Sequence, residues 1–217
     1  MANQIIYGRQ PVAEAERGRR RVHRIWRSPE TGAVELERLC GSADHQGVVA
    51  EVDPYPYADP RALLRGEDPL LVALDQVQDP RNLGAVCRSA EFAGAAGLVI
   101  PERRAAEVTP VTCKASAGAV EHLSIARVRN LADWLADAKS ANFWIWGADA
   151  EATQAPWDAD LTGPTVLVLG GEGKGIRPRV ASVCDDLIAL PRRGEVESLN
   201  VSAAAAALLF EALRQRG

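Results

Sequence analysis

A glycine-rich turn near the C-terminus has the residue types of a loop that binds a cofactor. An apolar run, residues 166–169, leads into it, and glycines occupy positions 170, 171, 173 and 175. A P-loop needs Ser or Thr directly after its Gly-Lys pair, whereas Lys174 is followed by Gly175. A dinucleotide fingerprint needs G-x-G-x-x-G after an early strand, and these glycines alternate as G-x-G-x-G late in the chain. Both common nucleotide motifs are therefore excluded, yet the bare backbone suits close contact with a cofactor.

A second turn follows the apolar run 187–190, which ends at Pro191 and precedes Ser198-Leu199-Asn200-Val201-Ser202. Two such turns side by side can surround an adenine and its ribose with backbone groups. Asn200 then has two interpretations, as a contact to a bound nucleotide or as the cap of the final helix. The sequence alone favours the cap, with Ser198 before it.

A third cluster of polar residues lies between residues 75 and 90. The chain leaves an apolar run, turns at Asp79-Pro80, and continues with apolar residues at helical spacing. Asn82 and Arg88 are nearly two helical turns apart, and Arg88 is predicted to lie close to the buried side. A buried arginine needs an anionic partner. That partner is either part of a substrate or an internal carboxylate such as Glu91 or Glu172.

These clusters require a framework that brings distant segments together. Apolar runs of strand length alternate with helical stretches from Pro69 onward, at residues 70–74, 97–100, 123–128, 143–146, 165–169 and 186–190. Continuous apolar strands separated by helices predict an α/β fold with a mostly parallel sheet, covered on both faces. Three prolines between residues 53 and 60 predict an extended linker. The predicted divisions are a first domain over 1–52, a linker over 53–69 and a second domain over 70–217.

Six arginines fall close together in the first domain, on a helical stretch predicted to begin at Pro11. They lie within eleven residues, with Trp26 among them: Arg17, Arg19, Arg20, Arg21, Arg24 and Arg27. One interpretation is a solvated surface. The other is a patch that contacts RNA phosphates, with Trp26 stacking on a base.

Composition limits the class of protein. The 217 residues are 47% hydrophobic with a net charge of -4, which does not suggest a surface that binds polyanions everywhere. The four cysteines form no C-x-x-C pair, the three histidines are scattered, and no metal site is predicted. The N-terminus lacks a signal-peptide pattern and no apolar run reaches the ~18 residues of a membrane span. We expect a cytoplasmic protein without a membrane partner.

Three motifs together resemble one family, the SpoU (TrmH-type) RNA 2'-O-ribose methyltransferases. They are Asp-Pro-x-Asn-Leu-Gly-Ala-x-x-Arg-Ser-Ala at 79–90, Leu-Gly-Gly-Glu-Gly-x-Gly-Ile at 169–176 and Ser-Leu-Asn-Val-Ser at 198–202. The first domain is similar to the substrate-binding domain of the branch that methylates a guanosine of 23S rRNA. That domain resembles RNA-binding ribosomal proteins, and here it is shorter, with a middle strand and helix expected to be missing or truncated between Trp26 and Leu39.

The resemblance implies a trefoil knot in the second domain, a homodimer, and S-adenosylmethionine as cofactor. It implies a cofactor site of seven residues: Leu169, Gly170, Gly175, Ile176, Ile188, Leu190 and Leu199. It implies a catalytic group of five: Asn82, Arg88, Glu172, Ser198 and Asn200. RNA contacts are expected from four arginines of the first domain: Arg19, Arg20, Arg21 and Arg24.

A ribose hydroxyl is a poor nucleophile, so the enzyme must align it with the methyl group and assist loss of its proton. A guanidinium stays protonated, so Arg88 is better suited to orienting the hydroxyl and stabilising negative charge than to acting as base. Two alternatives remain within the enzyme class, a tRNA ribose methylase and a resistance-type rRNA methylase acting on adenosine. A non-catalytic RNA-binding or ribosome-assembly factor is the alternative from another class.

Overall fold

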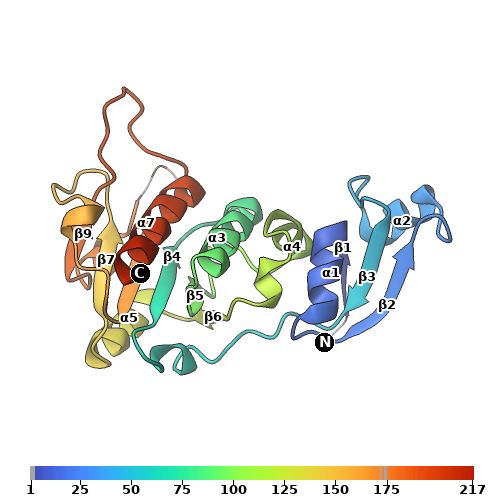
Figure 1. The fold of residues 1–217 in the computed structure, drawn as a ribbon, viewed down its shortest axis with the longest axis horizontal. Helices are drawn as coiled ribbons and strands as arrows, with labels where there is room; N and C mark the ends of the chain where they lie inside the picture. Colours follow the sequence, from blue (N-terminus) through green and yellow to red (C-terminus); the bar gives the residue numbers. More distant parts are fainter. Residues whose placement is uncertain (1–2, 172, 174) are drawn as a thin grey trace.

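The protein forms two sheets that lie along the long axis of the molecule, a small one near the N-terminus and a larger one beyond it (Figure 1). The structure is a computed structural model that describes residues 3–171, 173 and 175–217. Within these residues no helix is long and apolar enough to cross a membrane. The same residues contain no group of His, Cys, Asp and Glu side chains arranged to hold a metal ion.

The larger sheet has six strands in the order β6-β5-β4-β8-β7-β9, and every neighbouring pair is parallel. Its strands are β4 Leu70–Asp75, β5 Gly97–Pro101, β6 Ile125–Val128, β7 Trp144–Ala148, β8 Thr165–Gly170 and β9 Asp186–Ile188. Each of the six apolar runs singled out in the sequence contains one of these strands or overlaps it. The predicted α/β fold with a parallel sheet is therefore confirmed.

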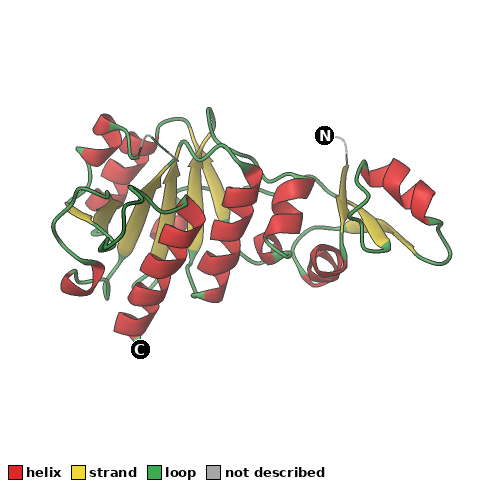
Figure 2. Ribbon diagram, turned by 90° about the horizontal axis from the view of Figure 1, so that it is seen from above, coloured by secondary structure: helices red, strands yellow, loops and turns green. Residues whose placement is uncertain are grey.

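Helices cover both faces of this sheet (Figure 2). They are α3 Pro80–Phe92, α4 Pro110–Ala115, α5 Leu131–Ser140, α6 Pro178–Ala181 and α7 Val201–Arg216. The central strand β4 shows how one strand serves two cores. Leu70, Val72 and Leu74 belong to the same cluster as buried residues of α3 and α7, whereas Leu71 and Ala73 pack with α5 and α6. Because successive strand residues point to opposite faces, an uninterrupted apolar run is needed here.

The N-terminal domain is an antiparallel sheet in the order β1-β3-β2 with two helices. Its elements are β1 Gln4–Tyr7, α1 Arg9–Arg17, β2 Val22–Arg27, α2 Ala33–Cys40 and β3 Val48–Val52. Between Trp26 and Leu39 the chain enters α2, a helix of eight residues that begins at Ala33. One expectation is corrected. The arginines are not carried by one helix, because α1 ends at Arg17 and the others lie in a turn and in β2.

Buried polar contacts join the two domains around η2, Ala119–Glu121. Arg20 is buried and forms an ion pair with Glu121, with Arg20 Nε 2.9 Å from Glu121 Oε2. The neighbouring Arg19 donates hydrogen bonds to the backbone carbonyls of Glu121 and Leu123. Burial lowers the pKa of Arg20, but the hydrogen bonds and charge interactions with Glu121 and Cys113 together outweigh it, so the pKa is raised. This ion pair is held inside the protein.

Helix α4 provides a second connection, because it packs against α3 on one side and β1 on the other. Lys114 Nζ lies 2.9 Å from the backbone oxygen of Asp44 and 5.7 Å from the centre of the Tyr7 ring. On the opposite side, a Cβ added to Gly84 of α3 would lie 2.6 Å from the Cβ of Ala115. Only glycine allows α3 and α4 to approach this closely.

The segment between the domains runs along the edge of the large sheet. The Tyr55 hydroxyl donates to the backbone oxygens of Val120 and Leu123, at 3.0 and 2.9 Å. Ala58 forms a parallel bridge with Ala126 of β6. A short turn, η1 Ala62–Leu64, then leads to β4. The segment is therefore attached to the sheet before the first parallel strand begins.

Candidate functional site

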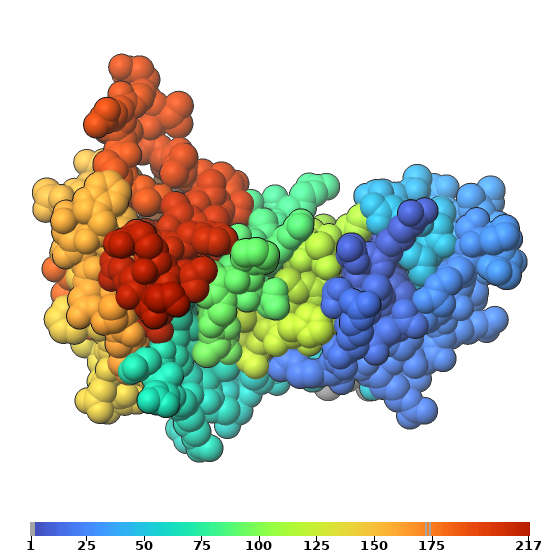
Figure 3. Space-filling model, in the orientation of Figure 1, coloured from blue at the N-terminus to red at the C-terminus, as the bar shows by residue number. Residues whose placement is uncertain are grey.

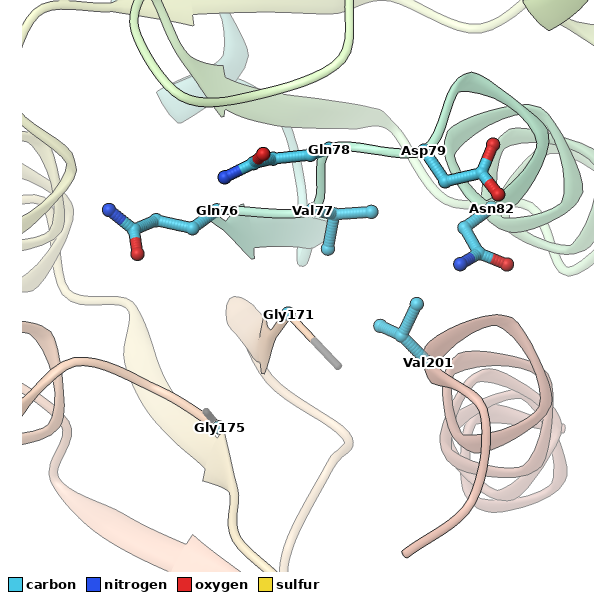
Figure 4. Close-up of a pocket in the computed structure, with 8 residues that line it drawn as sticks. All are labelled: Gln76, Val77, Gln78, Asp79, Asn82, Gly171, Gly175 and Val201. Atoms are coloured by element: carbon cyan, nitrogen blue, oxygen red, sulfur yellow. The ribbon is translucent and has the colours of Figure 1, made fainter. Parts of the chain in front are cut away.

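A pocket of about 380 Å³ opens where the carboxyl ends of β4 and β8 meet (Figure 4). Ligands of open parallel sheets bind at this edge because the loops that follow neighbouring strands converge there. The pocket is built from the turn after β4, the loop after β8 and the first turns of α3 and α7. Its lining residues are Gln76, Val77, Gln78, Asp79, Asn82, Gly171, Gly175 and Val201.

The glycines of the loop after β8 have two separate physical roles. A Cβ on Gly170 would lie 2.0 Å from the backbone carbon of Gly175, and one on Gly171 would lie 2.6 Å from the backbone oxygen of Gln76. The loop thus folds back on itself and packs against the turn after β4. Gly173 and Gly175 have positive φ angles of 72° and 61°, which other residues rarely adopt. Apart from its neighbours in the chain, no residue that the structure describes places an atom within 4 Å of a Cβ built on Gly175, so space remains beside its backbone.

Two asparagines from distant motifs meet at this pocket. Asn82 lies in the first turn of α3, which Asp79 caps by accepting a hydrogen bond from the Arg81 amide at 2.7 Å. Asn200 caps α7, with its Oδ1 2.8 Å from the Ser202 amide. Its Nδ2 donates to Asn82 Oδ1 at 3.1 Å. The predicted cap is confirmed, and the same side chain also joins the first and third motifs.

Arg88 lies on α3, two turns beyond the pocket, and its side chain is exposed. The expectation that it lies near the buried side is wrong, because Cys87 and Val86 occupy that face. No hydrogen bond or ion pair joins it to Glu91 or to any other residue that the structure describes. The exposed guanidinium is therefore available to an external anion. Glu172, the other carboxylate considered, lies outside the described residues.

The remaining predicted cofactor residues differ in where the structure places them. The side chains of Leu169, Ile176 and Ile188 are buried, and Leu190 packs at the margin of the core, so such residues can meet a ligand chiefly through backbone groups. Leu199 is 60% exposed. It lies with Ser198 in the segment between β9 and α7, which projects from the body of the molecule (Figure 3). Of the predicted cofactor residues, only Gly175 lines the described pocket.

Sequence reasoning did not single out most of the lining residues. Gln76, Val77 and Gln78 follow β4 directly, and Val201 begins α7. A signal was available, since residues directly after a parallel strand lie at the ligand-binding edge of the sheet. Gln76 also has a positive φ of 60°, a backbone conformation that the sequence did not reveal and that often marks functional sites.

Two of the four arginines expected to contact RNA have structural roles instead. Arg20 is buried against Glu121 and cannot reach a phosphate, and Arg19 donates hydrogen bonds to the backbone oxygens of Glu121 and Leu123. Arg21 and Arg24 are exposed. The Arg24 guanidinium lies 5.0 Å from the centre of the Trp26 ring, a cation–π contact on the N-terminal domain.

Comparison with known proteins identifies the family of this chain. A sequence model described as the SpoU rRNA Methylase family matches residues 69–210. The chain is 38% identical to YacO of Bacillus subtilis, named as a TrmH family tRNA/rRNA methyltransferase, over 97% of this chain and 95% of that protein. It is 43% identical to the 23S rRNA (guanosine-2'-O-)-methyltransferase RlmB of Photobacterium profundum, over 85% of this chain and 77% of that one.

A solved structure agrees with these relatives over nearly the whole chain. The SpoU methyltransferase AviRb from Streptomyces viridochromogenes, determined in complex with the cofactor AdoMet, superposes with a TM-score of 0.83 at 28% identity. The superposition covers 99% of this chain and 91% of that one, so it includes both sheets. With its three motifs meeting at one edge of the sheet, this chain belongs to the SpoU rRNA methylase family of RNA methyltransferases.

Proposed function

We propose that this protein transfers the methyl group of S-adenosylmethionine to a ribose 2'-hydroxyl of RNA, at a guanosine of large-subunit rRNA. The observation that carries the proposal is the Asn200–Asn82 hydrogen bond beside the glycine loop, which unites the three motifs in one pocket. Family membership supplies the reaction class, and the similarity to the Photobacterium enzyme supports the guanosine substrate.

The glycine loop fits such a cofactor. Gly175 presents its backbone to open space, and the loop is closed by a hydrogen bond from the Gly175 amide to the Gly171 oxygen at 3.1 Å. Backbone groups held in this way can recognise an adenosine without a side chain. We assign the cofactor to residues of this loop, of β9 and of the segment before α7: Leu169, Gly170, Gly175, Ile176, Ile188, Leu190 and Leu199.

When bound, S-adenosylmethionine supplies an activated methyl group on sulfur. Asn82 and Asn200, tied to one another, orient the ribose so that its hydroxyl lies in line with that group. Arg88 binds a neighbouring phosphate and stabilises the charge that develops on the oxygen as its proton passes to solvent water. Ser198 and Glu172 complete the proposed catalytic group.

The exposed arginines of the N-terminal domain are proposed to hold the RNA. Replacing Arg21 and Arg24 together by alanine should weaken RNA binding and reduce the slope of log affinity against log salt by about one to two, because each phosphate contact releases counterions. Fluorescence anisotropy across a salt series measures this slope. Arg38→Ala with Arg61→Ala removes the same charge from other exposed sites and should leave the slope unchanged. An equal loss of slope in both pairs would contradict the assignment.

We also propose that the protein works as a homodimer through an apolar face of α3 and α7. Phe92 and Phe210 are 74% and 45% exposed, and their ring centres lie 6.0 Å apart. Leu213 extends the same face, and large exposed apolar groups of this kind are typical of an interface. The proposed trefoil knot would lie in the same part of the chain, where α7 returns to pack against α3.

Phe92→Glu with Phe210→Glu should convert the dimer to monomers, because burying two carboxylates in an apolar interface is costly. Sedimentation velocity measures the change. Val34→Glu is the matched control, since Val34 is an exposed apolar residue of the N-terminal domain. A variant that still sediments as a dimer would show that another surface forms the interface.

The test of the proposed reaction is transfer of labelled methyl from S-adenosylmethionine to rRNA and tRNA, each taken from cells that lack this enzyme. We expect 2'-O-methylguanosine in large-subunit rRNA alone. Product in tRNA, or 2'-O-methyladenosine in rRNA, would replace the substrate assignment by the corresponding alternative. Cofactor binding without transfer to either RNA would favour a binding or assembly factor.

A further inference from the structure

Asp75, the last residue of β4, is attached to both ends of the loop 171–177. Its backbone oxygen accepts a hydrogen bond from the Gly171 amide at 2.9 Å. Its carboxylate accepts three hydrogen bonds from Arg177: Oδ2 from the backbone amide at 2.8 Å, and Oδ1 and Oδ2 from Nε at 2.8 and 3.1 Å. In the same ion pair, Arg177 Nη2 lies 2.7 Å from Oδ1. One residue therefore fixes the place where the glycine loop begins and the place where it ends.

The two side chains of this ion pair differ in their burial. The Asp75 side chain is fully buried, whereas that of Arg177 is 44% exposed, so the loop reaches inward to a fixed carboxylate. A buried carboxylate is costly unless charged donors satisfy it. The guanidinium and the backbone amide of one residue together do so, and contacts from two guanidinium nitrogens also fix orientation.

The next residue links the pair to the pocket. Gln76 lines the pocket and is held at a positive φ of 60°. Gly171 packs so closely on it that a Cβ there would lie 2.6 Å from the Gln76 oxygen. Any shift of the loop away from Asp75 would therefore alter the wall of the pocket as well as the glycine turn.

We propose that Asp75 and Arg177 are positioning residues that hold the glycine loop in the conformation that receives S-adenosylmethionine. This assignment rests on the proposed placement of the cofactor. Neither side chain lines the pocket, so both act through the loop. A loop that is already ordered loses less entropy on binding, and its affinity for the cofactor is correspondingly higher.

The experiment compares variants that remove the pair with one that removes a similar charge nearby. Arg177→Lys keeps the charge but loses the bidentate geometry. Asp75→Asn combined with Arg177→Ala removes both charges, so that no unpaired carboxylate is left buried. Arg179→Ala is the control, because Arg179 lies two residues farther on and pairs with the exposed Asp133 at 2.9 Å.

We expect the KM for S-adenosylmethionine to rise about tenfold or more in both Arg177 variants, the equivalent of one lost charged hydrogen bond. We expect kcat at saturating cofactor and the Kd for RNA to stay within about twofold of wild type. Asp75→Glu should also raise this KM, because a longer side chain cannot keep the carboxylate in its contacts with Arg177. Arg179→Ala should behave as wild type throughout.

A purely structural ion pair would give a different pattern. In that case the thermal midpoint of the double variant would fall while its KM for S-adenosylmethionine, measured well below the transition, stayed at the wild-type value. That result would overturn the assignment. Calorimetric titration of the wild-type protein separates this failure from a failure of the proposed function, since a wild type that binds no S-adenosylmethionine would remove the premise of both.

Discussion

Arg88→Ala should lower the rate of methyl transfer by about a hundredfold to a thousandfold, the usual cost of removing one group that stabilises developing negative charge. The loss should fall on kcat, because the charge develops only as the hydroxyl loses its proton. Single-turnover transfer of labelled methyl to RNA measures it. The fold should be unaffected, since the Arg88 side chain is exposed and makes no ion pair with the residues that the structure describes.

Two further variants make this prediction specific. Arg81→Ala removes an exposed arginine from the same helix and should keep near-normal turnover. Arg88→Lys should recover only part of the rate, since a lysine keeps the charge but not the planar fork that holds a phosphate. Near-normal turnover of Arg88→Ala would remove Arg88 from the catalytic group.

Arg20→Ala should destabilise the protein by ~3–5 kcal/mol, because it leaves the buried Glu121 carboxylate without its partner. Urea unfolding followed by circular dichroism measures the free energy of unfolding. Arg21→Ala is the control, since that side chain is the exposed neighbour and its removal should change stability little.

Replacing both charged residues shows whether the lost stability comes from the unpaired charge. Arg20→Met with Glu121→Leu should recover most of the stability lost in either single variant, because no charge then remains buried. The double variant should also bind RNA with the salt dependence of the wild type, because the buried Arg20 side chain cannot contact an RNA phosphate. A single variant as stable as wild type would mean that water reaches Glu121.

Much of the fold could be predicted because its signals are local. The first five residues of β4, Leu-Leu-Val-Ala-Leu, include no polar side chain, and a strand covered on both faces requires that composition. The helix starts at Thr109 and Asn130 were likewise predictable, since a side chain there accepts a hydrogen bond from an amide two or three residues later.

Some of the incorrect expectations concern contacts between distant residues. The segment with Arg19 and Arg20 has the composition of a phosphate-binding patch, and only the fold brings Glu121 against it. The pairing of Asp75 with Arg177 is equally invisible, because 102 positions separate the two residues. Asn200 shows the intermediate case, in which the local cap was predictable but the hydrogen bond to Asn82 was not.

The close packing of Gly84 on α4 has a consequence for how a nucleotide is chosen. Helix α3 carries Asn82 and Arg88, it rests on α4 without an intervening side chain, and α4 in turn rests on β1. This continuous packing fixes the distance between the N-terminal domain and the pocket. If RNA binds at Arg21 and Arg24, the methylated ribose is the one whose distance from that contact equals the distance between these arginines and the pocket. The shape of the RNA then selects the nucleotide as much as base identity does.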